Sequence, residues 1–389
     1  MEPQEKPRKM LNRDFVMILV ITFFYGLNMN LVNPITAQYA STLGANETIM
    51  GIAVGVFSIT ALLVRPITGP LSNNCDKKKM LILAFGVYSA ASFGYILFES
   101  IFNLMVMRFI HGFGVSLCSA LLPTLACDYV PENKIGAAIG YFAMSQTIAM
   151  AVGPTITIYI SDRFSYSVSF ILAGLVALAA LLLTTTLTKL HEEKGKLRFS
   201  FSDIISKKVV LPTVIHMVGA AVYSLISSFL VVYASTSRGI SPDKIGWYFT
   251  TYALALIATR PLLSYIEHRV KEIYTIIVAS ILAIISMVIL GFANNLFLFI
   301  LSSIIMAFGF GITMPVLNAL SVKLVEKENR AIANSTFNSG MDIGMGLGPV
   351  IGGLVASALG YSNMFLVFSA FEVLAIILAI LFKDKLKSR

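Results

Sequence analysis

The sequence has little charge for its length. Only 13% of its 389 residues are Asp, Glu, Lys or Arg, whereas 57% are hydrophobic. In soluble domains about 25% of all residues are usually charged. No polar stretch is long enough to form a sizeable soluble domain, so the composition argues against a soluble enzyme and against a sensor with an added signalling domain.

The sequence also has few of the residues that chemistry needs. Its three cysteines are odd in number and scattered, which indicates neither a disulfide framework nor a metal site (Cys75, Cys118 and Cys127). Its four histidines form no catalytic or metal-binding pattern. The phosphate-binding pattern Gly-x-x-x-x-Gly-Lys-Ser/Thr does not occur. We therefore expect no enzyme activity, no metal and no cofactor.

What the sequence does contain is a series of long apolar runs. A helix needs about 20 apolar residues to cross the hydrocarbon core of a bilayer. The sequence predicts an all-α membrane protein with twelve transmembrane helices. Their expected ranges are 15–40, 48–71, 80–98, 102–126, 135–160, 166–188, 210–236, 245–266, 273–293, 296–322, 331–358 and 361–382. The first run is too long for the core of a cleavable signal peptide.

Lysine and arginine set the expected orientation. With the N-terminus inside, nearly all basic loop residues fall on the inner side, and the outer loops hold only Arg163, Arg238 and Lys244. Inner loops of membrane proteins carry this excess of positive charge. We therefore expect an integral protein of the cell (inner) membrane with both termini in the cytoplasm. The net charge of +9 then faces anionic lipid and not nucleic acid.

The second half of the sequence repeats the first at a constant offset of 195 residues. Matches of Gly, Pro and Arg at one offset indicate a duplication. They include Gly44 and Gly239, Gly51 and Gly246, Arg65-Pro66 and Arg260-Pro261, Phe113-Gly114 and Phe308-Gly309, and Gly153-Pro154 and Gly348-Pro349. An even number of helices in each half makes the two halves parallel. We expect six-helix bundles at 1–188 and 210–389, joined by a cytoplasmic linker at 189–209, around a central cavity.

Three motifs make the chain resemble the major facilitator superfamily over nearly its full length. Gly69 to Lys78 resembles the Gly-x-x-x-Asp-Arg-x-Gly-Arg-Lys/Arg loop of that family, but Asn73, Asn74 and Asp76 replace its acid, its first Arg and its second Gly. Arg108-Phe-Ile-His-Gly resembles its Arg-x-x-Gln-Gly pattern. The third motif, Gly-x-x-x-Gly-Pro-x-x-Gly-Gly of the antiporters, is complete from Gly344 to Gly353 and partial from Ala149 to Pro154.

The resemblance implies transport by alternating access, with a small-molecule substrate bound between the halves and no ATP. The closest pattern is that of twelve-helix drug and metabolite proton antiporters. The leading hypothesis is therefore proton-coupled export of a small organic compound. The alternative is a proton-coupled or facilitative importer of a sugar, an organic acid or a nucleoside. We expect protons as the coupling ion and a monomer in the bilayer.

Four residues are candidates for proton coupling. Asp342 lies near the middle of the eleventh predicted helix, where a carboxylate is costly and marks a functional site by default. The resemblance places Arg108 in the central cavity, with His111 one turn along, although Arg108 near a helix start also has the option of reaching outward to the membrane surface. Glu372 lies in the last helix, where pairing or oligomerisation is an equal alternative.

Further polar residues are candidates for lining the cavity or for gating. The cavity candidates, each of which has helix-to-helix packing as its plain alternative, are Tyr25, Asn28, Gln146, His216, Tyr223 and Asn338. The gating candidates are Arg65, Gly69, Asn73, Asp76, Lys77, Gly153, Pro154, Arg260, Gly344, Gly348 and Pro349. Small residues at every fourth position let helix backbones approach closely, which suits a seam that seals and reopens.

Overall fold

The structure is a computed structural model that describes residues 10–188, 206–267, 269–326 and 330–382. The described residues form twelve long α-helices and two short 3-10 helices, at Glu132–Lys134 and Lys207–Val209. The long helices are α1 (Arg13–Thr42), α2 (Glu47–Asn74), α3 (Lys77–Gly94), α4 (Ile101–Asp128), α5 (Ile135–Arg163), α6 (Tyr166–Thr185), α7 (Val210–Arg238), α8 (Pro242–Glu267), α9 (Glu272–Phe292), α10 (Leu296–Lys323), α11 (Arg330–Leu359) and α12 (Tyr361–Leu381).

Local sequence signals explain where several helices begin and end. Asn12, Ser100, Ser165 and Asn295 each accept a hydrogen bond from the backbone N–H three residues later, and so cap α1, α4, α6 and α10. Gly44 and the glycine 195 residues later, Gly239, follow α1 and α7 with φ angles of 84° and 65°. This left-handed backbone suits glycine, and it ends both helices in the same way.

Helix α3 is shorter than expected, because it ends at Gly94 and not at residue 98. The Asn103 side chain of α4 donates hydrogen bonds to the carbonyl oxygens of Gly94 at 3.0 Å and Phe98 at 3.1 Å. These bonds tie the turn that follows α3 to the start of α4. The extra residues belong to a capped turn, which the apolar pattern alone does not distinguish from helix.

Ten of the twelve helices in the described part are long and apolar enough to cross a membrane. Helices α3 and α8 do not meet this criterion of length and apolar character. Helix α3 begins with three lysines, and α8 carries Arg260, Pro261 and several tyrosines and threonines. Large apolar side chains also face outward around the bundle, as in Phe102 and Leu381. The chain is therefore an integral membrane protein, although only ten of the twelve expected spans are identified independently.

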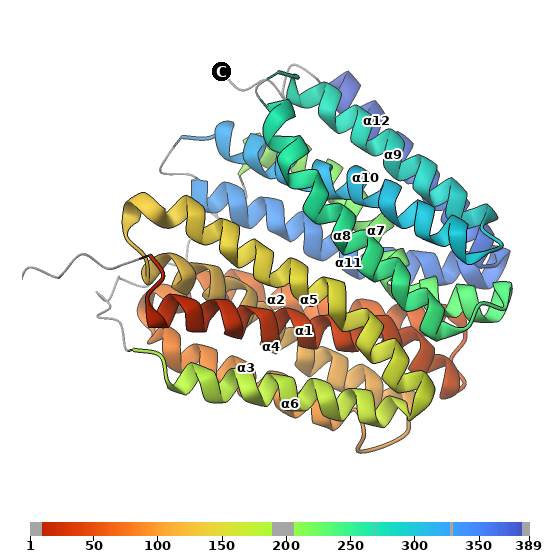
Figure 1. Cartoon of the computed structure of the whole chain (residues 1–389), viewed down its shortest axis with the longest axis horizontal. Coiled ribbons are helices and arrows are strands. Elements are labelled where there is room, and N and C mark those ends of the chain that lie inside the picture. Colours follow the sequence, from red (N-terminus) through yellow and green to blue (C-terminus); the bar gives the residue numbers. More distant parts are fainter. Residues whose placement is uncertain (1–9, 189–205, 268, 327–329, 383–389) are drawn as a thin grey trace, which may run out of the picture.

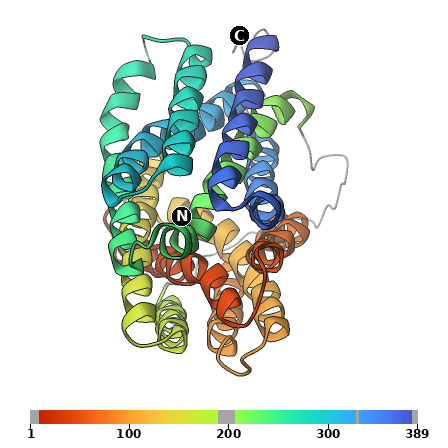
Figure 2. The same cartoon turned by 90° about the vertical axis from the view of Figure 1, so that its right-hand side faces the viewer.

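Helices of the same half of the chain pack on one another. Helices α1 to α6 lie together, as do α7 to α12, and the two sets meet along α2 with α11, α5 with α8, and α1 with α7 (Figure 1). A view turned by 90° shows the same two sets beside each other (Figure 2). We call the end of the bundle that holds Arg13, Lys77 and Lys323 the basic end, and the end that holds the turns at Gly44 and Gly239 the far end.

The buried core is shared at the far end and divided at the basic end. One cluster of buried residues joins both sets of helices and includes Leu31 and Met50 of the first set and Phe229 and Tyr233 of the second. Toward the basic end, α1 to α6 and α7 to α12 have separate clusters. The two sets are thus held together mainly through their far-end halves.

Candidate transport site and gates

The seam between α2 and α11 brings the backbones of the two sets of helices into close contact. A Cβ atom at Gly51 would overlap the carbonyl oxygen of Pro349, and one at Gly55 would lie 2.5 Å from that of Gly346. Gly353 in turn lies against the backbone of Glu47. Only glycine permits this contact, because any side chain would push the helices apart. All these contacts lie in the far-end half of the bundle.

Helices α5 and α8 form the second seam through polar contacts. The Thr155 hydroxyl lies 2.9 Å from the carbonyl oxygen of Gly246 and 2.8 Å from the Thr250 hydroxyl. The Thr250 hydroxyl donates to the carbonyl oxygen of Ala151 at 3.1 Å. On the basic-end half of α5, by contrast, Gly136 and Gly140 have no atom within 4 Å of an added Cβ. The two sets therefore touch at the far end and separate toward the basic end.

The predicted glycine gates lie mainly within each set and not between them. Gly153 of α5 packs on Asn30 of α1, and Pro154 beside it is buried. Gly344 and Gly348 of α11 pack on α7 at Met217 and Ala221. Among the described glycines, those that join the sets are Gly51, Gly55, Gly246, Gly346 and Gly353. The matching of Gly51 with Gly246 at the 195-residue offset is the sequence signal that singles out two of them.

Arg108 is completely buried and points toward α2 and not outward to the membrane surface. Its guanidinium donates to the carbonyl oxygens of Ala53 at 3.3 Å and Val54 at 3.0 Å, and to the Asn33 side chain at 2.9 Å. It also lies 4.4 Å from the centre of the Phe57 ring, a cation–π distance. Among the described residues, no carboxylate forms an ion pair with it. Arg108 thus ties α4 and α1 to the stretch of α2 that forms the seam.

His111 lies beside this site in the core of the first set. Its Nδ1 atom is 2.8 Å from the Tyr95 hydroxyl, and its ring meets the Tyr88 ring edge-on at 4.5 Å. Its Nε2 atom is buried and has no hydrogen-bond partner among the described residues. The ring is 1% exposed, so water reaches it only if the core opens.

Two of the predicted cavity residues on α1 hold helices together. Asn28 is fully buried and donates to the Ser92 hydroxyl at 3.0 Å and to the carbonyl oxygen of Ala173 at 2.7 Å. Tyr25 packs against Tyr88, with ring centres 5.8 Å apart. These contacts join α1 to α3 and α6.

A column of stacked rings runs through the second set and reaches the first. Phe337, His216, Phe310 and Tyr223 stack in this order, with ring centres 4.3, 6.2 and 4.9 Å apart. The Tyr223 hydroxyl then lies 3.9 Å from the sulfur atom of Met150 on α5. Both ring nitrogens of His216 are buried without a hydrogen-bond partner among the described residues. Tyr223 is the member of the column that lies at the junction of the two sets.

Gln146 lies on α5 close to Gly26 of α1. It is half-buried, in the part of α5 that leads from the far-end seam toward the open basic end. Its role as a cavity residue stays a prediction.

Asp342 lines a cavity of about 110 Å³ between α2 and α11, directly on the basic-end side of their seam. The other residues of its lining are almost all apolar: Ser58, Ile59, Leu62, Ile343, Gly346 and Leu347. Asn338, one turn before Asp342, is half-buried and donates to the Asn334 side chain at 3.2 Å. The structure therefore places Asp342 where the two sets of helices part.

Glu372 of α12 is 4% exposed and lies inside the second set. One of its carboxylate oxygens is 3.4 Å from the position of a Cβ atom at Gly219 of α7, and Ser280 of α9 lies beside it. The carboxylate thus faces other helices of its own set.

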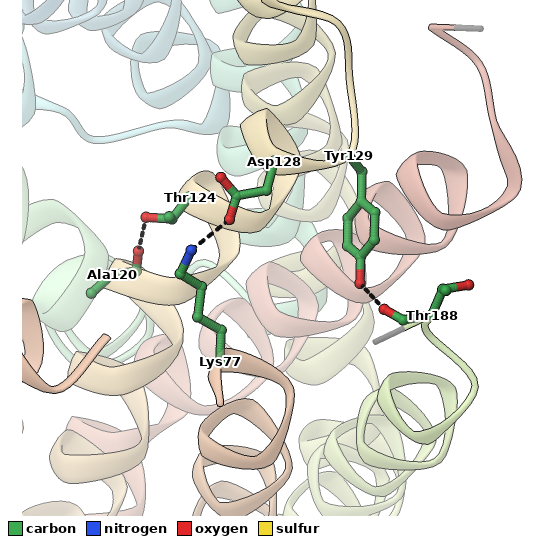
Figure 3. A network of polar contacts seen from close by, with 6 residues as sticks. All are labelled: Lys77, Ala120, Thr124, Asp128, Tyr129 and Thr188. Atoms are coloured by element: carbon green, nitrogen blue, oxygen red, sulfur yellow. Dashed lines mark hydrogen bonds and ion pairs between the residues drawn. The ribbon is translucent and has the colours of Figure 1, made fainter. Parts of the chain in front are cut away.

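An ion pair joins α3 and α4 at the basic end. Lys77 and Asp128 are 2.7 Å apart (Figure 3). Asp76 caps α3 by accepting from the backbone N–H of Lys79. The equivalent positions of the second set hold an ion pair in which the acidic and basic residues have exchanged helices. It joins Glu272 of α9 and Lys323 of α10 at 3.2 Å. Both residues of this second pair lie 195 positions after those of the first.

Four other residues are gating candidates at this end of the bundle. Arg260 is exposed on α8. The side chains of Arg65 and Asn73, together with Gly69, lie outside the described residues. Near the pair of Lys77 and Asp128, the Tyr129 hydroxyl donates to the carbonyl oxygen of Thr188 at 2.7 Å, which connects α4 with the chain that follows α6 (Figure 3).

Comparison with known proteins decides the family. The sequence profile described as the Major Facilitator Superfamily matches residues 18–236 and 212–389. The chain belongs to this superfamily. Its members are membrane transporters and not enzymes.

The most similar curated relatives include an uncharacterized MFS-type transporter of Methanocaldococcus jannaschii, which is 24% identical and covers 95% of this chain and 98% of its own. The staphylopine export protein of Staphylococcus aureus is 23% identical over 95% of this chain and 96% of its own. The quinolone resistance protein NorA of the same species is 22% identical over 90% of each chain.

Among solved structures, a nucleoside transporter, NupG, has a TM-score of 0.81 at 14% identity, over 96% of this chain and 100% of its own. A bacterial homolog of the human lysosomal transporter Spinster, described as inward-facing and unoccupied, has a TM-score of 0.80 at 15% identity, over 96% of both chains. These likenesses establish the fold.

Proposed function

We propose that this protein exports a small organic solute in exchange for protons, with Asp342 as the coupling carboxylate. The position of Asp342 carries the proposal. It lies in the middle of α11 and lines the cavity at the point where the two sets of helices part. A carboxylate at this depth in a membrane protein costs free energy, so its presence marks a functional candidate by default. Rocking of the two sets would change its access to water and hence its protonation.

The two sets are proposed to be parallel repeats that rock about a central site. Equivalent contacts 195 residues apart support this. A Cβ atom at Gly114 of α4 would meet Ala84 and Tyr88 of α3, and one at Gly309 of α10 would meet Ala279 and Ala283 of α9. The two ion pairs at the basic end occupy equivalent places as well. Parallel repeats with a site between them are a known transporter design.

The structure corresponds to a state that is closed at the far end. Glycine contacts seal α2 against α11 there, whereas Gly136 and Gly140 on the other half of α5 meet nothing. The excess of Lys and Arg supports a cytoplasmic basic end with both termini inside the cell membrane. This state would then face inward, and likeness to a structure described as inward-facing is consistent with it.

Export is the proposed direction because two relatives of nearly full coverage are named for it, one for the export of staphylopine and one for resistance to quinolones. The antiporter-like glycine motif of α11 favours the same direction. Import by the same fold is the competing outcome, as the nucleoside transporter of similar structure illustrates. A membrane potential of 100 mV supplies about 2.3 kcal/mol per charge moved, enough for roughly 50-fold accumulation of solute.

Proteoliposomes that enclose a pH-sensitive dye test the proposal. A panel of drugs and metabolites is added to vesicles that contain either the wild type or Asp342→Asn. We expect at least one compound to move protons through the wild type and none through the variant, while the variant still binds that compound. Equal proton movement through both proteins would refute the role of Asp342. Proton movement in the same direction as the solute would replace export by import.

A further inference from the structure

The far-end contact between α5 and α8 contains two threonines whose hydroxyl groups cross the seam. The hydroxyl of Thr155 on α5 lies 2.9 Å from the carbonyl oxygen of Gly246 on α8, and that of Thr250 on α8 lies 3.1 Å from the carbonyl oxygen of Ala151 on α5. The two hydroxyl oxygens are 2.8 Å apart. We call these two hydroxyls and two carbonyl oxygens the hydroxyl latch.

The acceptors of the hydroxyl latch are exchanged between the two helices. Ala151 is four residues before Thr155, and Gly246 is four residues before Thr250. In an α-helix, a threonine hydroxyl reaches the carbonyl oxygen four residues before it. Each threonine therefore bonds across the seam to the carbonyl oxygen that its partner would use within its own helix.

Hydrogen bonds within one helix are the common arrangement for threonine in this protein. On the same two helices, Thr147 donates to the carbonyl oxygen of Ala143 at 2.9 Å and Thr251 to that of Trp247 at 2.8 Å. A rotation about χ1 would give both threonines of the hydroxyl latch the same kind of partner. Parting of α5 and α8 then leaves neither hydroxyl unpaired, which would be costly in surroundings of low polarity.

The equivalent positions of the other far-end seam, between α2 and α11, carry no hydroxyl. The residues 195 positions away from Thr250 and Thr155 are Gly55 and Val350. They also meet, since a Cβ atom at Gly55 would lie 2.8 Å from a methyl group of Val350. These positions are in contact through packing, and their parting exchanges no side-chain hydrogen bond. The two far-end seams are thus equivalent in place and different in chemistry.

We propose that Thr155 and Thr250 are gating residues, and that the far end opens between α5 and α8 by exchange of their hydrogen bonds. In the closed state the hydroxyls bond across the seam, and in the open state each bonds to its own helix. The exchange keeps the free energies of the two states close, as repeated opening requires. The inference rests on the rocking motion of the proposed function and assigns two residues to it.

Spin labels at Arg163 and Lys244 would report on this seam. Both residues are exposed, and they lie at the far ends of α5 and α8. The labels are attached to the full chain in nanodiscs, in a background without the three native cysteines. Electron paramagnetic resonance then gives the ratio of open to closed distances. Thr155→Val with Thr250→Val removes both hydroxyls and keeps the shape of the side chains, whereas serine at both positions keeps the hydroxyls.

We expect two distances with threonine at both positions, and an open-to-closed ratio about fivefold lower in the valine double variant. This change corresponds to about 1 kcal/mol, the net contribution of one hydrogen bond. In the closed seam the valines leave no partner unpaired, because both hydroxyls are removed together, whereas the open seam would expose methyl groups in their place. The serine double variant should stay within about twofold of the wild type. Thr147→Val, the matched control on α5, should change nothing.

A single short distance in the wild type at both acidic and neutral pH would overturn the proposal. An unchanged ratio in the valine double variant, or an equal fall in the serine double variant, would overturn it as well. If the valine double variant does not fold, Thr250→Val alone replaces it, with a smaller fall expected in the same direction. The labels follow the gate without solute or proton movement, so failure of proton coupling through Asp342 leaves this result unaffected.

Discussion

At the scale of single residues, buried polar side chains in this protein mostly hold helices together. Arg108 is fully buried, and it is held by carbonyl oxygens of α2, by Asn33 and by the Phe57 ring. Asn28 connects α1 with α3 and α6 in a similar way. Asp342 differs from both, since it lines a cavity at the parting of the two sets.

The hydrogen bonds of Arg108 predict a stability effect that charge alone does not. In Arg108→Lys, one ammonium group replaces a planar group that reaches three acceptors in fixed directions. We expect a loss of about 1–3 kcal/mol, because at least one buried acceptor loses its partner. Thermal unfolding in detergent measures the change. Arg260→Lys is the control, since Arg260 is exposed. Equal melting temperatures for both variants would contradict this account.

The sequence alone does not show which neighbouring helices these side chains face. The depth of Asp342 and Arg108 in their helices follows from hydrophobic runs, so both are identified as intramembrane charges from the sequence alone. Which neighbour each one meets depends on helix rotation and packing. The sequence therefore leaves two alternatives for the Arg108 side chain: it reaches outward to the membrane surface, or it is buried in the bundle. Only the position of α2 beside it decides between them. The glycines Gly55 and Gly346 are missed for the same reason, because only their mutual contact distinguishes them from other glycines.

At the scale of helices, the two ion pairs at the basic end allow an internal test. Lys77 on α3 pairs with Asp128 on α4, and the equivalent α9 and α10 use Glu272 and Lys323 with the charges exchanged. We expect Lys77→Glu and Asp128→Lys each to lower stability and the double variant to recover most of the loss. The coupling energy should be about 0.5–1 kcal/mol, because both side chains are partly exposed.

A double-mutant cycle on thermal unfolding measures that coupling energy. The same exchange of Glu272 and Lys323 serves as the control in the second set. If the double variant is as unstable as the sum of the two single variants predicts, the pair does not brace α3 against α4.

The seam between α2 and α11 predicts how the closed end responds to added volume. In Gly51→Val, the new side chain would overlap the backbone of α11 at Pro349. We expect the far end to open, with spin labels on far-end loops of the two sets moving apart by several ångströms and transport falling at least about tenfold, since overpacking of this kind costs about 1–3 kcal/mol. Gly140→Ala, where open space surrounds the backbone, should leave the distance unchanged.

Unchanged far-end distances in Gly51→Val, measured by electron paramagnetic resonance, would show that the seam is not a gate.

The helix ranges follow from the sequence within a few residues. The exceptions have local causes, such as the Asn103 contacts that end α3 at Gly94.

At the scale of the whole molecule, the two sets of helices share a core at one end and have separate cores at the other. The repeat, the apolar runs and the family resemblance all follow from the sequence, and the family is confirmed by comparison. Which end is closed does not follow from the sequence, because both states use the same residues. In this structure, a Cβ atom added at Gly136 or Gly140 of α5 would meet open space.

Counterflow separates coupling from transport most directly. Proteoliposomes are loaded with unlabelled solute, labelled solute is added outside at equal pH, and the same vesicles are then tested with an imposed pH gradient. We predict that Asp342→Asn keeps exchange of labelled for unlabelled solute within about threefold of the wild type, because the rocking of the two sets is intact. It should lose accumulation driven by the gradient. Gradient-driven accumulation equal to that of the wild type in the Asp342→Asn protein would contradict the account.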